Sequence, residues 1–247
     1  RWTHKFEIKP GRWVYVPTEE CRKYGRQILK HLRKKWKPPE YYYHLRDGGH
    51  VEALKIHLEN QYFAHLDIKD FFGSISRSRV TRALKPFFGY EKAREIAKMS
   101  TVKNPNNHPH SHMLPYGFVQ SPLLASICLH KSYLGNLLRK LHKNGDIKIS
   151  VYMDDIVISS NDEELLQQAY DELKQAAEKS HFQLNEQKEQ PPSTKITAFN
   201  IEISHNSMKI TEERMVEFHE DYTKSDNEHQ RKGIGSYVRS VNPEQAK

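Results

Sequence analysis

The chain has 247 residues and a net charge of +8, with a pI near 9.2. Hydrophobic residues make up 36% of it and the mean hydropathy is −0.84, so a core of ordinary size is combined with a very polar surface. No apolar run reaches the roughly 18 residues of a membrane span, and we expect no membrane partner. The excess of Lys and Arg favours a polyanionic partner, because each cation that neutralises a phosphate releases a counterion.

The cysteine content bears on the cellular compartment, and the first residue bears on where the chain begins. Cys21 and Cys128 are the only cysteines, and their spacing predicts neither a metal site nor a disulfide framework. This favours a reducing compartment, and we expect a cytoplasmic protein. The chain begins with Arg1 rather than Met, so we expect its true N-terminus to lie upstream.

The N-terminal part is basic and aromatic, and alternation, capping residues and prolines divide it into short elements. Thr18 is expected to cap a helix whose first turn contains Glu19 and Glu20, where the helix dipole favours acids. The predicted elements are a strand at 12–17, a helix at 18–36, a helix at 50–60 and a strand at 62–68.

The rest of the chain alternates helices with short strands. Helical periodicity runs from Pro122 to residue 142 without an early breaker, whereas Gly233 and Gly235 are expected to break a partly helical stretch at 211–247. The other predicted elements are helices at 78–86, 91–99 and 162–180, a loop at 103–112, a hairpin of strands 147–152 and 156–159, and strands at 181–185, 197–204 and 207–210. This order predicts an α+β fold with helices on one face of an antiparallel sheet.

The strongest chemical signal is the pair Asp154-Asp155, which lies at the tip of the predicted hairpin between two apolar runs. Adjacent carboxylates are costly to bury unless a cation neutralises them. Carboxylate oxygens suit hard divalent ions such as Mg²⁺. An isolated Asp-Asp pair is more often a solvated turn, so the interpretation needs a second element.

Two further motifs support a functional role for the Asp154-Asp155 pair. The chain contains DIxxFF at 67–72, LPxGxxxSP at 114–122 and YxDD at 152–155, in that order. Each motif alone is weak, but the three in series resemble the palm motifs of reverse transcriptases. The resemblance covers nearly the whole chain and is closest to compact bacterial enzymes of retron and phage-defence systems. Four further segments carry the resemblance. Residues 12–17 resemble the RxIxxP signature of the fingers, and residues 232–238 resemble the start of a thumb. Residues 182–185 with Lys188 resemble the fourth palm motif, and residues 198–203 resemble the fifth, although Asn-Ile replaces its usual Leu-Gly.

The resemblance implies a right-hand polymerase of the α+β class. The fingers would comprise residues 1–62 and the palm 63–210, with 79–113 partly connecting the two. The palm would be an antiparallel sheet with helices on one face. A helical thumb would begin within residues 211–247.

The resemblance also implies site residues and cofactors. Two Mg²⁺ ions, with Mn²⁺ as an alternative, would be held by Asp67, Asp154, Asp155 and the backbone carbonyl of Ile68, and the three aspartates would be catalytic. The residues expected to bind the nucleotide are Arg12, Asp70, Phe71, Phe72, Tyr116, Gly117 and Lys188.

Several of these residues have an alternative structural interpretation. Arg12 would clamp the γ-phosphate with its bidentate fork, or be an exposed surface arginine. Phe72 stands at the family's sugar gate, where a ring excludes the ribose 2′-hydroxyl, or is simply core, as Phe71 is expected to be. Lys188 would donate a proton to the departing pyrophosphate, or remain solvated.

Tyr116 departs from the family pattern, in which most members have Gln at this position. That glutamine contacts the incoming nucleotide near its sugar, whereas a tyrosine offers a flat face and one hydroxyl. We therefore expect unusual base selection, template use or processivity.

The expected function is RNA-directed DNA synthesis in a bacterial antiviral defence or retron-like system. One alternative is a template-independent or non-standard-template polymerase, which Tyr116 keeps open. Another is a degenerate nucleic-acid-binding subunit, which the three clustered acids oppose. The expected partners are an RNA template or associated non-coding RNA, the DNA product, deoxynucleoside triphosphates, and a protein partner or a second copy of the chain.

Two other features remain open. His108, His110 and His112 alternate as ligands on a strand would, but the surrounding Pro and Asn residues predict a loop without a metal. The run 41–43 of three tyrosines, close to Arg46, would either stack on bases or form a half-buried aromatic cluster.

Overall fold

The computed structural model describes residues 1–105 and 109–246, so His108 lies outside the described residues. The helices are α1 Glu19–Lys35, α2 Gly49–Lys55, α3 Arg77–Phe88, α4 Tyr90–Ser100, α5 Ser121–His130, α6 Tyr133–Asn144, α7 Glu163–Lys179, α8 Glu212–Lys224 and α9 Glu228–Val241. The strands are β1 Trp2–Lys9, β2 Arg12–Pro17, β3 Tyr62–Asp67, β4 Val102–Lys103, β5 His112–Met113, β6 Lys148–Tyr152, β7 Asp155–Ser160, β8 Gln190–Ser193, β9 Lys195–Ala198, β10 Ile201–Ser204 and β11 Ser207–Ile210.

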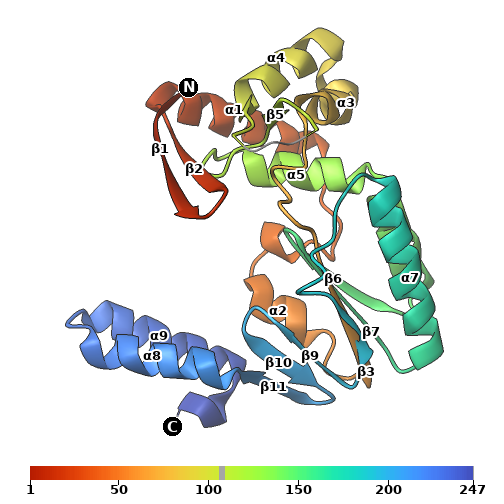
Figure 1. Cartoon of the computed structure of the whole chain (residues 1–247), viewed down its shortest axis with the longest axis vertical. Coiled ribbons are helices and arrows are strands. Elements are labelled where there is room, and N and C mark those ends of the chain that lie inside the picture. Colours follow the sequence, from red (N-terminus) through yellow and green to blue (C-terminus); the bar gives the residue numbers. More distant parts are fainter. Residues whose placement is uncertain (106–108, 247) are drawn as a thin grey trace. The chain divides into compact units, whose positions relative to one another are not determined.

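The predicted α+β class is confirmed. The main sheet has the strand order β6-β7-β3-β8, and all of its strand pairs are antiparallel (Figure 1). A second antiparallel sheet has the order β11-β10-β9.

The described chain divides into two compact units. The first unit comprises residues 1–40, 68–140 and 173–184, and the second comprises 41–67, 141–172 and 185–247. The division into fingers at 1–62, palm at 63–210 and thumb from 211 stays a prediction.

In the first unit, a β1–β2 hairpin precedes α1 (Figure 1). The strand at 12–17 and the capping role of Thr18 are confirmed, since the Thr18 side chain accepts a hydrogen bond from the Cys21 N–H. The sequence did not predict β1, because all eight of its residues are exposed and no buried face marks it.

The prediction of one uninterrupted helix from Pro122 is wrong, because α5 ends at His130 and α6 begins at Tyr133. The Ser132 side chain accepts a hydrogen bond from the Gly135 N–H at 3.1 Å and so starts the second helix. A Cβ atom at Gly135 would lie 2.1 Å from the carbonyl oxygen of Leu129, so only glycine fits this close turn.

The core of the second unit lies between α2, the main sheet and the β9–β11 sheet. Val51 and Leu54 of α2 belong to one buried cluster with Phe63 and Val157 of the main sheet. Val238 and Val241 add the end of α9 to this cluster. The predicted break at Gly233 and Gly235 is wrong, since α9 runs through both glycines and packs beside α8 (Figure 1).

Three further sequence predictions need correction. The predicted strand at 197–204 is a hairpin, because Phe199 and Asn200 have positive φ angles of 56° and 59° and form its turn. The predicted strand at 181–185 is absent from the described structure apart from one isolated bridge, and β8 pairs with β3 instead. The predicted helix at 50–60 ends early, at Lys55.

A buried histidine ties two strands of the main sheet together. His57 contacts the Ser159 hydroxyl through Nδ1 at 2.6 Å and the Ser150 hydroxyl through Nε2 at 2.8 Å. Burial, with the nearby charge of Lys148, lowers the pKa of His57 to about 3. The neutral ring therefore links β6 to β7 without introducing a buried charge.

Candidate active site

Three aspartates meet at one end of the main sheet, all within the second unit. Asp67 is the last residue of β3 and pairs directly with Asp155, the first residue of β7. Asp154 lies in the two-residue turn that joins β6 to β7. One carboxylate oxygen from each residue lies within 4.8 Å of the others, so the structure brings the three predicted acids together.

The electrostatics of this cluster fit a bound cation. Asp67 is only 2% exposed. Burial, followed by the charges of Asp155 and Asp67, raises the pKa of Asp154 to about 6. Like charges held this close together, one of them buried, call for a neutralising cation, and carboxylate oxygens are ligands that suit Mg²⁺.

The side chain of Lys188 places a positive charge beside the aspartate cluster. Its ammonium lies 2.7 Å from Asp67 Oδ2, although the lysine side chain is 56% exposed. Burial disfavours the charged ammonium, but the hydrogen bond to Asp67 and the charges of the three aspartates outweigh it and raise the pKa of Lys188. Lys188 is therefore paired with the acids rather than simply solvated.

His65 was not among the predicted site residues. Its Nε2 lies 2.8 Å from Asp155 Oδ1, and its Nδ1 lies 3.4 Å from the side-chain amide nitrogen of Gln190. Gln190 is in turn fixed by two hydrogen bonds to the backbone of Thr197. If the amide donates to Nδ1, Nε2 carries the proton and donates to Asp155, which orients that carboxylate.

His44 was also not among the predicted site residues. Its Nδ1 accepts a hydrogen bond from the Met153 N–H at 3.0 Å, inside the turn that carries Asp154. Met153 has a φ of 60°, which is uncommon for a residue with a side chain. Burial lowers the pKa of His44 to about 4, so the ring is neutral and can accept this bond. His44 thus supports an unfavourable turn conformation next to the acids.

The first unit groups the residues expected around the nucleotide sugar. Phe72 is 5% exposed, and its ring centroid lies 4.7 Å from that of Tyr116. The Arg12 guanidinium carbon lies 5.1 Å from the Tyr116 ring centroid. Arg12, Tyr116 and Phe72 therefore form one packed series, with Tyr116 between the cation and the buried ring.

Gly117 is held in place by the backbone of β2. Tyr15 donates its N–H to the Tyr116 carbonyl at 2.9 Å. Gly117 has a φ of 97°, and a Cβ atom there would lie 2.3 Å from the Tyr15 carbonyl oxygen. Only glycine satisfies both conditions, which explains its presence beside Tyr116.

The other predicted residues are placed as follows. Asp70 and Arg12 line a cavity of about 770 Å³ in the first unit. Phe71 is 2% exposed and packs against Phe182 with ring centroids 5.9 Å apart, as a core residue does. Ile68 is fully buried and forms an isolated bridge with Leu184. The metal-binding role of the Ile68 carbonyl and the nucleotide-binding roles stay predictions.

A family model for reverse transcriptase (RNA-dependent DNA polymerase) matches residues 4–225. The chain therefore belongs to the reverse transcriptase family. Among solved structures it is similar to a telomerase from Candida albicans, in complex with a TWJ fragment of telomeric RNA. The TM-score is 0.58 at 11% identity, over 89% of this chain and 46% of the telomerase chain.

It is also similar to a foamy viral protease-reverse transcriptase in complex with double-stranded DNA, with a TM-score of 0.53 at 14% identity. This match covers 95% of the present chain and 35% of the viral one. The chain thus spans less than half the length of either structure, and the likeness concerns the fold. No match was found among curated proteins.

Within the described residues, no helix combines the length and the apolar character needed to cross a bilayer.

Proposed function

We propose that this protein is an RNA-directed DNA polymerase that adds deoxynucleotides by two-metal phosphoryl transfer. The observation that carries the proposal is the convergence of Asp67, Asp154 and Asp155 in a chain of the reverse transcriptase family. Two Mg²⁺ or Mn²⁺ ions held there, with the Ile68 carbonyl as a further ligand, would activate the primer 3′-hydroxyl and neutralise charge on the triphosphate.

The chain's own residues would do the remaining work. Arg12 would hold the γ-phosphate, because a guanidinium can donate two parallel hydrogen bonds to phosphate oxygens. Phe72 would exclude a ribose 2′-hydroxyl. Lys188, whose ammonium is already charged beside Asp67, would donate a proton from Nζ to the leaving pyrophosphate.

We further propose a biological setting and partners. The segment at 12–17 resembles the RxIxxP signature of bacterial and group II intron-type enzymes, and supports a retron-like or antiviral defence system of bacteria, in the cytoplasm. An associated RNA would serve as template, and a protein partner or second copy of the chain would join it.

Primer extension on a defined RNA template tests the proposed activity. With the full chain, all four deoxynucleotides and Mg²⁺, we expect DNA complementary to the RNA and no product in EDTA. The same assay without template addresses the alternative, since products of equal length with and without RNA would favour a template-independent enzyme. Absence of product on RNA, on DNA and without template would contradict any polymerase activity.

The specific observation that favours the template-independent alternative is Tyr116, which stands where most family members have Gln. Because its ring packs on Phe72 and under Arg12, we expect the ring rather than the hydroxyl to matter. Tyr116→Phe should therefore change incorporation less than about twofold. Tyr116→Gln, which restores the common residue, removes a ring whose stacking on a base would contribute about 1–3 kcal/mol, and should move the enzyme towards copying mixed templates.

The measurement is kcat/KM for each of the four deoxynucleotides on a heteropolymeric RNA. We expect wild type and Tyr116→Phe to share a restricted nucleotide preference that Tyr116→Gln relaxes. Equal use of all four nucleotides by wild type and Tyr116→Gln alike would show that the substitution is neutral.

A further inference from the structure

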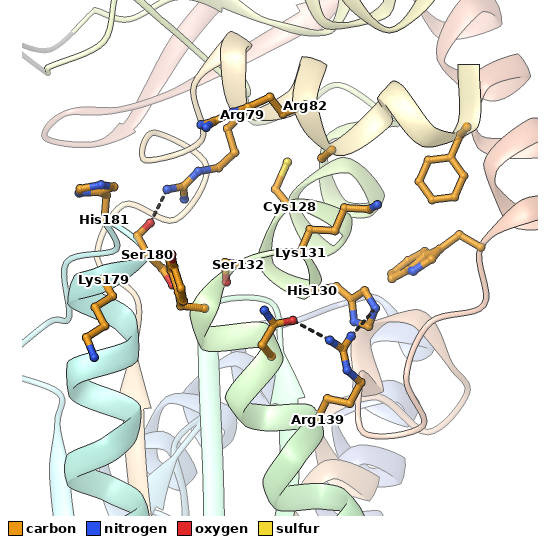
Figure 2. A pocket seen from close by; sticks show the side chains of 15 residues that line it. Arg79, Arg82, Cys128, His130, Lys131, Ser132, Arg139, Lys179, Ser180 and His181 are labelled. Atoms are coloured by element: carbon orange, nitrogen blue, oxygen red, sulfur yellow. Dashed lines mark hydrogen bonds between the residues drawn. The ribbon is translucent and has the colours of Figure 1, made fainter. Parts of the chain in front are cut away.

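The first unit contains a second cavity, of about 900 Å³, whose lining shares no residue with the expected catalytic and nucleotide-binding set. It lies between α3, residues 131–132 with the start of α6, and the end of α7 (Figure 2). All of its lining residues belong to the first unit.

The lining is strongly basic. Among the residues that the structure describes, no Asp or Glu lines this cavity. Figure 2 shows basic side chains from three separate parts of the chain around a common space. These basic residues are Arg79, Arg82, His130, Lys131, Arg139, Lys179 and His181.

The positive charge of the cavity is not compensated within the chain. In the described part of the protein, Arg82, Lys131, Arg139 and Lys179 form no ion pair with a carboxylate, whereas lysines such as Lys92 do. Arg139 instead donates to the Asn136 side chain at 2.6 Å. A cluster of like charges repels itself, so an anion bound here would relieve the repulsion.

Arg79 shows the same imbalance. Arg79 donates through Nη2 to the Ser180 carbonyl (Figure 2), while its buried Nη1 has no hydrogen-bond partner among the described residues. Burial, followed by the charges of Arg139 and Lys131, lowers the pKa of His130, so the cations around this ring keep it neutral near pH 7. An anion in the cavity would supply the missing acceptor for Arg79 Nη1 and a counter-charge for its guanidinium.

Aromatic side chains are interleaved with these cations. Lys131 Nζ lies 5.2 Å from the Phe87 ring centroid, and the Trp36 and His130 rings meet edge to face at 5.7 Å. Tyr133, the first residue of α6, is 66% exposed and so presents an uncovered ring at the cavity. This arrangement suits a nucleic-acid strand, because the cations can contact its phosphates while the exposed ring stacks on one of its bases.

We propose that this cavity binds a single-stranded segment of nucleic acid, with phosphates on Arg82, Lys131, Arg139 and Lys179 and one base stacked on Tyr133. A single strand fits better than a duplex, because its bases are unstacked and free to pack on a ring in a concave site. This second site goes beyond the proposed polymerase function and does not depend on it, since binding can be measured without catalysis.

The test is the binding of a labelled 12-nucleotide RNA, and of the DNA of the same sequence, to the full chain in EDTA. The triple variant Arg82→Gln/Lys131→Gln/Lys179→Gln changes only exposed side chains. We expect roughly 10- to 50-fold weaker binding near 0.15 M salt, and a slope of log affinity against log salt that is smaller by about 2, since each phosphate contact in a single strand contributes about 0.7.

A matched control removes the same charges elsewhere in the first unit. Lys85→Gln/Arg94→Gln/Lys98→Gln changes three exposed cations of α3 and α4 that do not line the cavity, and we expect affinity and slope close to those of wild type. Tyr133→Ala should weaken binding roughly 5- to 100-fold without changing the slope, because it removes a stacking surface and no charge.

Photo-crosslinking of a 4-thiouridine RNA locates the contact. Crosslinks mapped within residues 128–139 that disappear in the triple variant would support the site, and whichever of RNA and DNA binds more tightly would identify the strand. Equal weakening by the triple variant and its control would overturn the proposal. So would cavity-dependent binding of a duplex as tight as that of the single strand, or competition by polyglutamate as strong as that by RNA.

Discussion

Asp67→Asn and Asp154→Asn are each expected to lower nucleotide incorporation by about 10³-fold or more while the chain stays folded. An amide keeps the shape of the carboxylate but removes the charge that holds a divalent ion. Metal ions supply several kcal/mol of transition-state stabilisation, and each 1.4 kcal/mol corresponds to a tenfold change in rate. The measurement is kcat/KM for a deoxynucleotide in metal-controlled buffer.

Thermal unfolding in EDTA separates a chemical effect from misfolding. Partial burial, followed by the charges of Asp155 and Asp67, raises the pKa of Asp154, so its replacement by the neutral Asn should not lower the melting temperature. Asp146→Asn, an exposed acid at the other end of β6, is the matched control and should leave incorporation unchanged. Near-normal incorporation by either site variant would contradict the two-metal proposal.

Phe72→Ala is expected to reduce discrimination against ribonucleotides by roughly 10- to 100-fold. Phe72 is buried against Tyr116, so its ring has little room to move away from a 2′-hydroxyl. Opening a pocket by the size of such a group changes discrimination by about 1–3 kcal/mol. The measurement is the ratio of kcat/KM for a deoxynucleotide to that for its ribonucleotide.

Loss of a buried ring also destabilises the fold, by about 3–5 kcal/mol. Phe72→Val therefore serves as a milder variant that should shift the ratio in the same direction. Leu84→Ala, in the fully buried face of α3, controls for destabilisation alone and should leave the ratio unchanged. If the ratio stays constant in both Phe72 variants, Phe72 is a core residue and sugar selection lies elsewhere.

The aspartate cluster could be predicted because each acid belongs to a motif next to a recognisable strand. His65 could also have been found, because side chains alternate along a strand and residue 65 shares a face with Asp67. His44 could not, since it meets Met153 from 109 positions away in the sequence and only the fold brings them together.

The errors in secondary structure have physical causes. Helical periodicity continues across residues 131–132, so the break between α5 and α6 depends on the local fit of Ser132 and Gly135. Conversely, two glycines did not break α9. Each costs about 1 kcal/mol in a helix, but packing of Val238 and Val241 in the core outweighs that local preference.

The pairing of Asp67 with Asp155 limits how this protein can vary in length during evolution. Side chains alternate between the two faces of a sheet, so inserting or deleting one residue within β3 or β7 would turn one aspartate to the opposite face. The His57 links to Ser150 and Ser159 oppose any such shift between β6 and β7. Insertions compatible with activity are therefore expected in connections away from the aspartates, such as residues 225–227 between α8 and α9.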